Sequence, residues 1–206
     1  MSMRIDYFIS LNSPWTHFGA DRIVALAAWK EATLRVHPVD LGGTVFPASG
    51  GLPLAKRSPQ RRAYRMQELI RWRTHLDIPI DLEPTHFPFD EALAAQCVIA
   101  VRELRDDKRA VALAHRILKA LWEEGRNPGD REDLAGLIAD INLDPAWLLK
   151  EADREEWARQ RREDSAMALE RGVFGAPTYI IEDEIFWGQD RLDFVKRHLE
   201  AMEERR

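Results

Sequence analysis

The chain has 206 residues, 45% of them apolar and 32% charged, with a formal net charge of −5. This composition is typical of a soluble globular protein, and the lack of a basic excess argues against nucleic-acid binding. No apolar run is long enough for a membrane span or a leader, so we expect a cytoplasmic protein without membrane contact. No metal-ligand spacing is present. Cys97 is the sole cysteine, which excludes an internal disulfide and predicts an inert, buried thiol.

The first forty residues predict a strand, a helix and a second strand. Residues 5–9 form an apolar run, and Pro14 suits the first turn of a helix that continues to about Lys30. Residues 33–39 alternate as a second strand would, and the default connection is a right-handed parallel crossover. Glycines and a proline over 42–53 predict a long loop.

The middle of the chain is helical, and its end returns to strands. The expected helices cover 59–76, 91–104, 107–124, 131–141 and 145–171. Residues 178–181 and 184–187 predict an antiparallel hairpin, and 190–202 a last helix. This order, βαβ, helices, then ββα, predicts an α/β protein of the thioredoxin-like class. Its thioredoxin-like domain comprises 1–55 and 172–206, and 56–171 form an inserted all-helical domain.

Ser13 and Thr16 stand where the first strand meets the first helix. Thioredoxin-type enzymes carry Cys-x-x-Cys at this junction, and a hydroxyl cannot replace a thiol in disulfide exchange. The usual redox chemistry is therefore absent. A hydroxyl donor at a helix N-terminus remains, which favours a bound anion.

Pro177 precedes the predicted hairpin, after Gly175 and Ala176. A cis-proline at this position of a thioredoxin-like fold leaves the backbone N–H and C=O of Ala176 free to pair with an extended peptide-like ligand. A trans-proline at a strand start is the alternative. The order of the two motifs favours the cis form.

Gly188, Gln189 and Asp190 follow the hairpin. Backbone N–H groups at a helix start and the Asp190 carboxylate suit the two charges of an amino-acid head group. A simple N-cap role for Asp190 is the alternative.

Taken together, these motifs make the chain resemble the 2-hydroxychromene-2-carboxylate isomerases, relatives of the kappa-class glutathione transferases in the DsbA-like thioredoxin superfamily. The resemblance runs in order along nearly the whole chain and rests on residues 7–15, 42–46, 86–89, 172–178 and 186–192. It implies a homodimer that binds glutathione and a small aromatic carboxylate substrate.

By the same resemblance, Ser13 hydrogen-bonds the glutathione sulfur, while Ala176, Pro177, Gly188, Gln189 and Asp190 hold the tripeptide. The thiolate would add reversibly to a conjugated intermediate, interconverting 2-hydroxychromene-2-carboxylate and trans-o-hydroxybenzylidenepyruvate. The chain departs from the family at Gly51 and near Pro47, where asparagine and lysine are usual. Lys56 or Arg57 would have to replace those contacts.

Other residues carry two readings each. Trp15, His17 and His86 are candidates for the substrate pocket, as an aromatic wall or a proton carrier, or are packing residues. A basic segment is either a solvated helix face or an attractor for an anionic substrate. Its members are Lys56, Arg57, Arg61, Arg62, Arg65, Arg71 and Arg73.

Three functions stay open. The first is a glutathione-dependent isomerase with Ser13 stabilising the thiolate. The second is a kappa-like glutathione transferase working at the same site. The third is a redox-inactive thioredoxin-like module that binds peptides or proteins.

Overall fold

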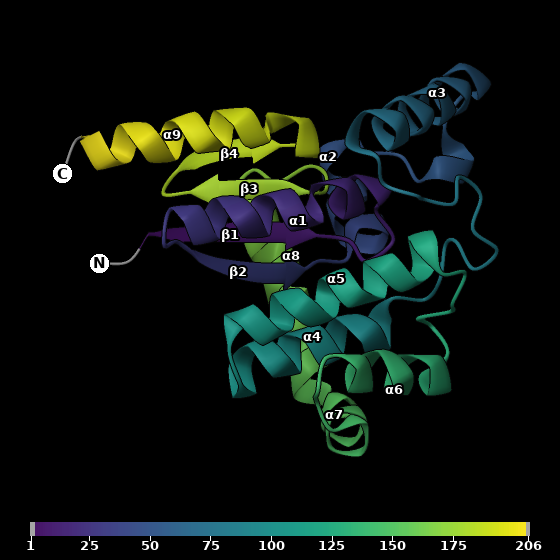
Figure 1. Cartoon of the computed structure of the whole chain (residues 1–206). Coiled ribbons are helices and arrows are strands. Elements are labelled where there is room, and N and C mark those ends of the chain that lie inside the picture. Colours follow the sequence, from purple (N-terminus) through teal and green to yellow (C-terminus); the bar gives the residue numbers. More distant parts are fainter. Residues whose placement is uncertain (1–2, 205–206) are drawn as a thin grey trace.

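The computed structural model describes residues 3–204, which form a mixed sheet of strands in the order β2-β1-β3-β4. β1 (Arg4–Ile9) pairs in parallel with β2 (Thr33–Pro38) and antiparallel with β3 (Thr178–Ile181), and β3 pairs antiparallel with β4 (Glu184–Trp187). α1 and α9 lie on one face of the sheet and α8 on the other (Figure 1). Because both faces are covered, β1 is buried from its second residue onward. The predicted fold class is confirmed.

Helices supply most of the remaining structure. They are α1 (Pro14–Trp29), α2 (Phe46–Ser49), α3 (Pro59–Leu76), α4 (Ala92–Leu104), α5 (Asp107–Glu123), α6 (Arg131–Asp140), α7 (Pro145–Ala152), α8 (Glu155–Glu170) and α9 (Leu192–Glu204). Several starts follow directly from the sequence. Ser13 and Asp144 each accept a backbone N–H of the first turn, and a proline occupies that turn.

Three expected elements differ in the structure. The single helix expected over 145–171 is two helices, because Arg154 has an extended backbone with ψ of 134°. The expected loop over 42–53 contains a π-helical turn (Leu41–Val45) and α2, and a 3-10 turn (Leu54–Lys56) follows it. The last helix is preceded by a 3-10 turn (Gln189–Arg191). No glycine or proline marks the break near Arg154, and α7 and α8 both pack against α4.

One hydrophobic core runs from the sheet into the inserted helices. It joins Ile5 and Tyr7 of β1 to Val98 of α4, Ile117 of α5 and Leu137 of α6, all fully buried. The insert therefore shares its apolar interior with the strands. α3 differs, because Leu69 is its one buried residue, and Figure 1 shows it projecting from the rest of the molecule.

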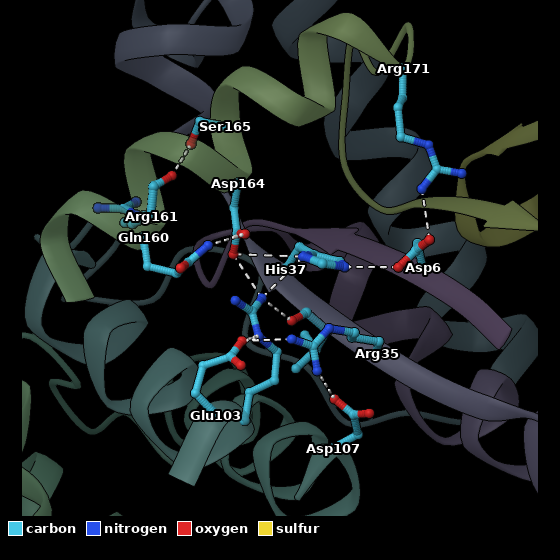
Figure 2. A network of polar contacts seen from close by, with 12 residues as sticks. Asp6, Arg35, His37, Glu103, Asp107, Gln160, Arg161, Asp164, Ser165 and Arg171 are labelled. Carbon is cyan, nitrogen blue, oxygen red and sulfur yellow. Dashed lines mark hydrogen bonds and ion pairs between the residues drawn. The ribbon is translucent and has the colours of Figure 1, made fainter. Parts of the chain in front are cut away.

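A buried polar network also connects the sheet to the insert (Figure 2). His37 of β2 lies 3.0 Å from Asp6 Oδ1 through Nε2, and Arg102 of α4 donates to Asp164 Oδ2 of α8 at 2.7 Å. Arg102 also donates to the Val36 carbonyl oxygen at 2.9 Å. Burial alone would raise the pKa of Asp6 and of Asp164. Hydrogen bonds from His37 and from arginines outweigh it, so both carboxyls have a pKa below the usual range.

Candidate active site

A cavity of about 1060 Å³ opens where the ends of β1 and β3 face the insert. Ligand pockets commonly span roughly 300–1,000 Å³, so this one has room for a peptide-sized cofactor beside a small acid. Ser13, Trp15 and Ala176, all predicted from the sequence, line it. The two motifs that lie 163 positions apart in sequence thus meet at one site.

Ser13 sits between the start of α1 and the segment ahead of Pro177. Its Oγ accepts the Thr16 N–H at 3.2 Å, as a helix N-cap does. Its hydroxyl proton is directed at the Ala176 carbonyl oxygen, with the two oxygens 3.4 Å apart. That distance is long for an O–H···O bond, so the hydroxyl can turn to a closer acceptor in the cavity. The α1 N-terminus adds a positive partial charge at the same place.

The Ala176–Pro177 peptide bond is cis, as predicted. Within residues 3–204, the Ala176 N–H has no hydrogen-bond partner. The Pro177 carbonyl oxygen accepts the Gly188 N–H at 2.9 Å, which fastens the segment after β4 to the proline loop. An extended ligand lying along Ala176 would find an open backbone donor there.

Gly188, Gln189 and Asp190 lie next to this loop but do not line the large cavity. Gly188 has φ of +104°, which favours glycine. Gln189 is 2% exposed, and its Oε1 accepts a bond from Arg22 at 2.6 Å, so its side chain already has a structural partner. Asp190 is exposed and pairs with Arg191 at 3.2 Å. Of the three residues, only Asp190 has a side chain that a bound ligand could reach from solvent.

His17 and His86 also lie outside the cavity, unlike Trp15. His17 Nε2 is 2.9 Å from Glu123 Oε1 of α5, and burial lowers the pKa of His17 although Glu123 opposes the shift. His86 borders a second pocket of about 370 Å³, which shares Phe87 and Phe89 with the large cavity. Neither histidine is placed to move a proton at Ser13. Trp15 lines the cavity and packs against Phe18, so its position is compatible with both predicted roles.

Two aromatic side chains that were not predicted as site residues, Phe174 and Trp187, also line the cavity. Phe174 and Trp187 meet edge to face at 4.7 Å between ring centroids, and both are largely exposed. The Trp187 indole lies so close to Gly175 that a Cβ there would come within 2.4 Å of Nε1. Glycine at 175 is therefore what allows the indole to reach the backbone beside Ala176.

Asn12 is the second unpredicted feature. Its side-chain amide donates to the Phe89 carbonyl oxygen and accepts the Phe89 N–H, both at 3.0 Å. This two-point contact holds the aromatic wall of Phe87 and Phe89 against the Ser13 loop. Only the fold brings these segments together, and nothing in the local sequence around Asn12 signals the pairing.

Glu91 strengthens the same junction. Its Oε2 accepts bonds from Ser10 and from the Asn12 backbone, and its Oε1 pairs with Arg161 of α8 at 2.8 Å. Burial raises the pKa of the Glu91 carboxyl, while Arg161 opposes the shift. Its oxygens are already used, so we assign it a structural role.

Arginines form one wall of the cavity. Arg57, Arg61, Arg62 and Arg65 line it, whereas Arg71 and Arg73 of the same basic segment do not. Lys56 and Pro47 are not lining residues, but Gly51 is. The part of the basic segment nearest Ser13 thus faces the cavity rather than bulk solvent alone.

Other residues of interest carry no chemistry here. Cys97 is buried, as predicted, and burial raises the pKa of its thiol to about 12. Thr16 Oγ1 is buried beneath the site. Over residues 3–204 there is no group of acidic, histidine or cysteine side chains suited to a metal ion. No helix within that range combines the length and apolarity of a bilayer span.

The family model of DSBA-like thioredoxin domains matches residues 4–200. The chain belongs to this family. Among its relatives, 2-hydroxychromene-2-carboxylate isomerase from Sphingobium xenophagum is 27% identical over 201 residues, covering 97% of this chain and 99% of the relative. The protein of the same name from Pseudomonas putida is 26% identical, covering 92% and 91%.

Solved structures agree on the fold. A 2-hydroxychromene-2-carboxylate isomerase structure superposes with a TM-score of 0.83 at 24% identity, covering 97% of this chain and 96% of the other. The cytosolic disulfide reductase DsbM from Pseudomonas aeruginosa has a TM-score of 0.71 at 21% identity, covering 99% and 100%. These relatives confirm the predicted resemblance to the isomerases, and they support isomerase activity for this DSBA-like chain.

Proposed function

We propose that the protein is a glutathione-dependent isomerase that interconverts 2-hydroxychromene-2-carboxylate and trans-o-hydroxybenzylidenepyruvate, or a closely related aromatic acid. The observation that carries the proposal is the Ser13 hydroxyl, which lines the cavity between the α1 N-terminus and Ala176. The curated relatives of that name, similar over nearly their whole length, add support.

The residues present fit glutathione. The free Ala176 N–H suits the backbone of its cysteinyl residue, and the exposed Asp190 carboxylate suits its ammonium group. When bound, glutathione would supply a thiolate that adds reversibly to a conjugated double bond. The Asn and Lys contacts usual in the family have no counterpart at Gly51 and Pro47, and Lys56 does not line the cavity, so the proposed glutathione contacts are those of Ser13, Ala176 and Asp190.

Ser13 would act on the sulfur in two ways. Its Oγ lone pair is held by the Thr16 N–H, which leaves the proton free to donate. Donation to sulfur, together with the helix N-terminus, stabilises the charged form and lowers the thiol pKa. Trp15 and Phe87 flank the same space and would hold a flat aromatic ring. The chain thus would position and ionise the nucleophile.

The test is an incubation of the protein with 2-hydroxychromene-2-carboxylate and glutathione, with both products and free glutathione quantified. We expect isomerisation that requires glutathione and leaves its amount unchanged. Consumption of glutathione in proportion to product would identify a kappa-like transferase instead. No heat of binding at millimolar glutathione, with no turnover, would favour the binding module and end the proposal.

A further inference from the structure

Arg57 and Arg65 are two half-buried cations that lack an acidic partner. In residues 3–204, neither forms an ion pair with any carboxylate. Arg57 Nε donates to the Leu52 carbonyl oxygen at 2.8 Å, which fixes its position while leaving its terminal nitrogens available. Both guanidinium groups line the same cavity as Ser13.

The acids in the cavity wall do not neutralise them. Glu91 is held by Arg161, Asp90 accepts the Ala92 N–H at 3.0 Å, and Asp40 accepts the Gly43 N–H at 2.9 Å. Five arginines line the cavity against these three acids. The excess positive charge therefore faces the space that a substrate would enter.

The pair also carries an electrostatic cost. Burial, with a smaller contribution from the neighbouring charge of Arg57, lowers the pKa of Arg65 to about 10. Burial likewise lowers the pKa of Arg57, with Arg61 adding to the shift. Like charges gathered in a partly desolvated site are stabilised when an anion binds between them. Arg61 and Arg62 are more exposed, so they suit long-range attraction better than binding.

The surroundings of Arg65 indicate the shape of the anion. Its guanidinium lies over the Phe87 ring, 5.6 Å from the centroid. An arginine oriented by an aromatic face presents its edge, which matches the two oxygens of a carboxylate. Phe87 and Phe89 extend an apolar surface from that point along the cavity. A carboxylate joined to a flat, conjugated ring satisfies both features.

We infer that Arg57 and Arg65 together form the binding site for the substrate's carboxylate, with its aromatic ring against Phe87. This inference rests on the proposed function, and it adds which residues orient the acid. Glutathione's own carboxylates, which the same chemistry would bind, are the competing occupants.

Calorimetry with trans-cinnamate and its uncharged amide tests the inference without any need for turnover. Arg65→Met keeps the apolar stem over Phe87 and removes the charge. We expect cinnamate to bind roughly 10- to 150-fold more weakly to this variant, the range for losing a hydrogen bond to a charged group. Cinnamamide binding and the glutathione Kd should stay unchanged. Arg57→Met should behave alike, and Arg73→Met, an exposed arginine of α3 away from the cavity, should bind all three ligands as the original chain does.

Several results would overturn the inference. The first is that the original chain does not bind cinnamate at millimolar concentration. The second is that Arg73→Met loses as much cinnamate affinity as Arg65→Met does. The third is that Arg65→Met or Arg57→Met binds glutathione more weakly while its cinnamate affinity is unchanged. In the last case the pair holds the cofactor instead. Circular dichroism and an Arg65→Lys variant, which keeps a charge without the planar fork, separate a binding defect from misfolding. A failed glutathione requirement in the isomerase assay would remove the proposed function yet leave the cinnamate result standing.

Discussion

Replacing Ser13 with alanine removes two interactions at once. The first is the N-cap, in which Oγ accepts the Thr16 N–H at 3.2 Å. Its loss costs about 0.5–2 kcal/mol, and each 1 kcal/mol lowers Tm by roughly 2–4 °C in a chain of this size. The second is the hydroxyl proton on the cavity side. A hydrogen bond to a charged group contributes about 1.5–3 kcal/mol, and sulfur, being larger and softer than oxygen, should receive less.

We therefore expect about 1–2 kcal/mol from the bond between Ser13 and the thiolate, which overlaps the low end of the charged range and extends below it. The pKa of bound glutathione would then rise by about 0.7–1.5 units in Ser13→Ala, and kcat/KM would fall about 5- to 30-fold. Thiolate absorbance followed against pH measures the pKa, and thermal unfolding measures the cap.

Two further variants separate the interactions. Ser13→Gly loses the hydroxyl, but glycine at an N-cap costs only about a few tenths of a kcal/mol. Ser13→Thr keeps both interactions. We expect the alanine and glycine variants to lose catalysis equally, while only the alanine variant loses stability. An unchanged thiol pKa and rate in Ser13→Gly would refute the role of Ser13.

Three other predictions concern the structure around the site. Arg102→Met should lower the free energy of unfolding by about 3–5 kcal/mol in denaturant, because it leaves the buried Asp164 carboxylate without its arginine partner at 2.7 Å. The control Arg159→Met removes an exposed arginine and should change this free energy by less than about 0.5 kcal/mol. A change that small in Arg102→Met would contradict the prediction. The carboxyls of Asp6 and Asp164 have depressed pKa values, so their contribution to stability should be complete above about pH 4 and should be lost as the pH falls below it. If the free energy of unfolding does not fall as the pH is lowered below about 4, these two carboxyls do not stabilise the fold in this way. Gly175→Ala should lower the free energy of unfolding by about 1–3 kcal/mol, because the added Cβ overpacks against Trp187. The same substitution should cost less in a Trp187→Ala background. An equal cost in both backgrounds would show that the contact with Trp187 is unimportant.

Local signals in the sequence were enough to predict most elements. Strand alternation, the N-cap and proline pairs and the hairpin turn each depend on neighbouring residues, and the structure confirms them. The break near Arg154 was missed because no glycine or proline marks it, and both flanking halves have helical spacing. In the structure α7 and α8 both pack against α4, on either side of the break, and a local pattern cannot show that.

The candidate site was predictable only where motif order carries information. Ser13 and Ala176 belong to motifs with a known spatial relation in thioredoxin-like folds, so their meeting follows from the topology. Asn12 and Phe89 are joined by side-chain geometry across 77 positions, and no spacing signals that bond. Each of the two interpretations of the basic segment, a solvated helix face and an attractor for an anion, fits a different part of it. Arg65 faces the cavity and Arg73 does not, a distinction that depends on where α3 projects.

α3 carries Arg65, and its apolar contact with the interior consists of the buried Leu69 and the partly buried Met66, Trp72 and Leu76. Exchanging the outer surface of this helix should therefore change which acids the protein accepts while leaving its folding nearly untouched. On the proposed function, two proteins of this fold would differ in the acid they bind through substitutions on the exposed face of α3. A graft of α3 surface residues between two such proteins offers a direct route to altered selectivity.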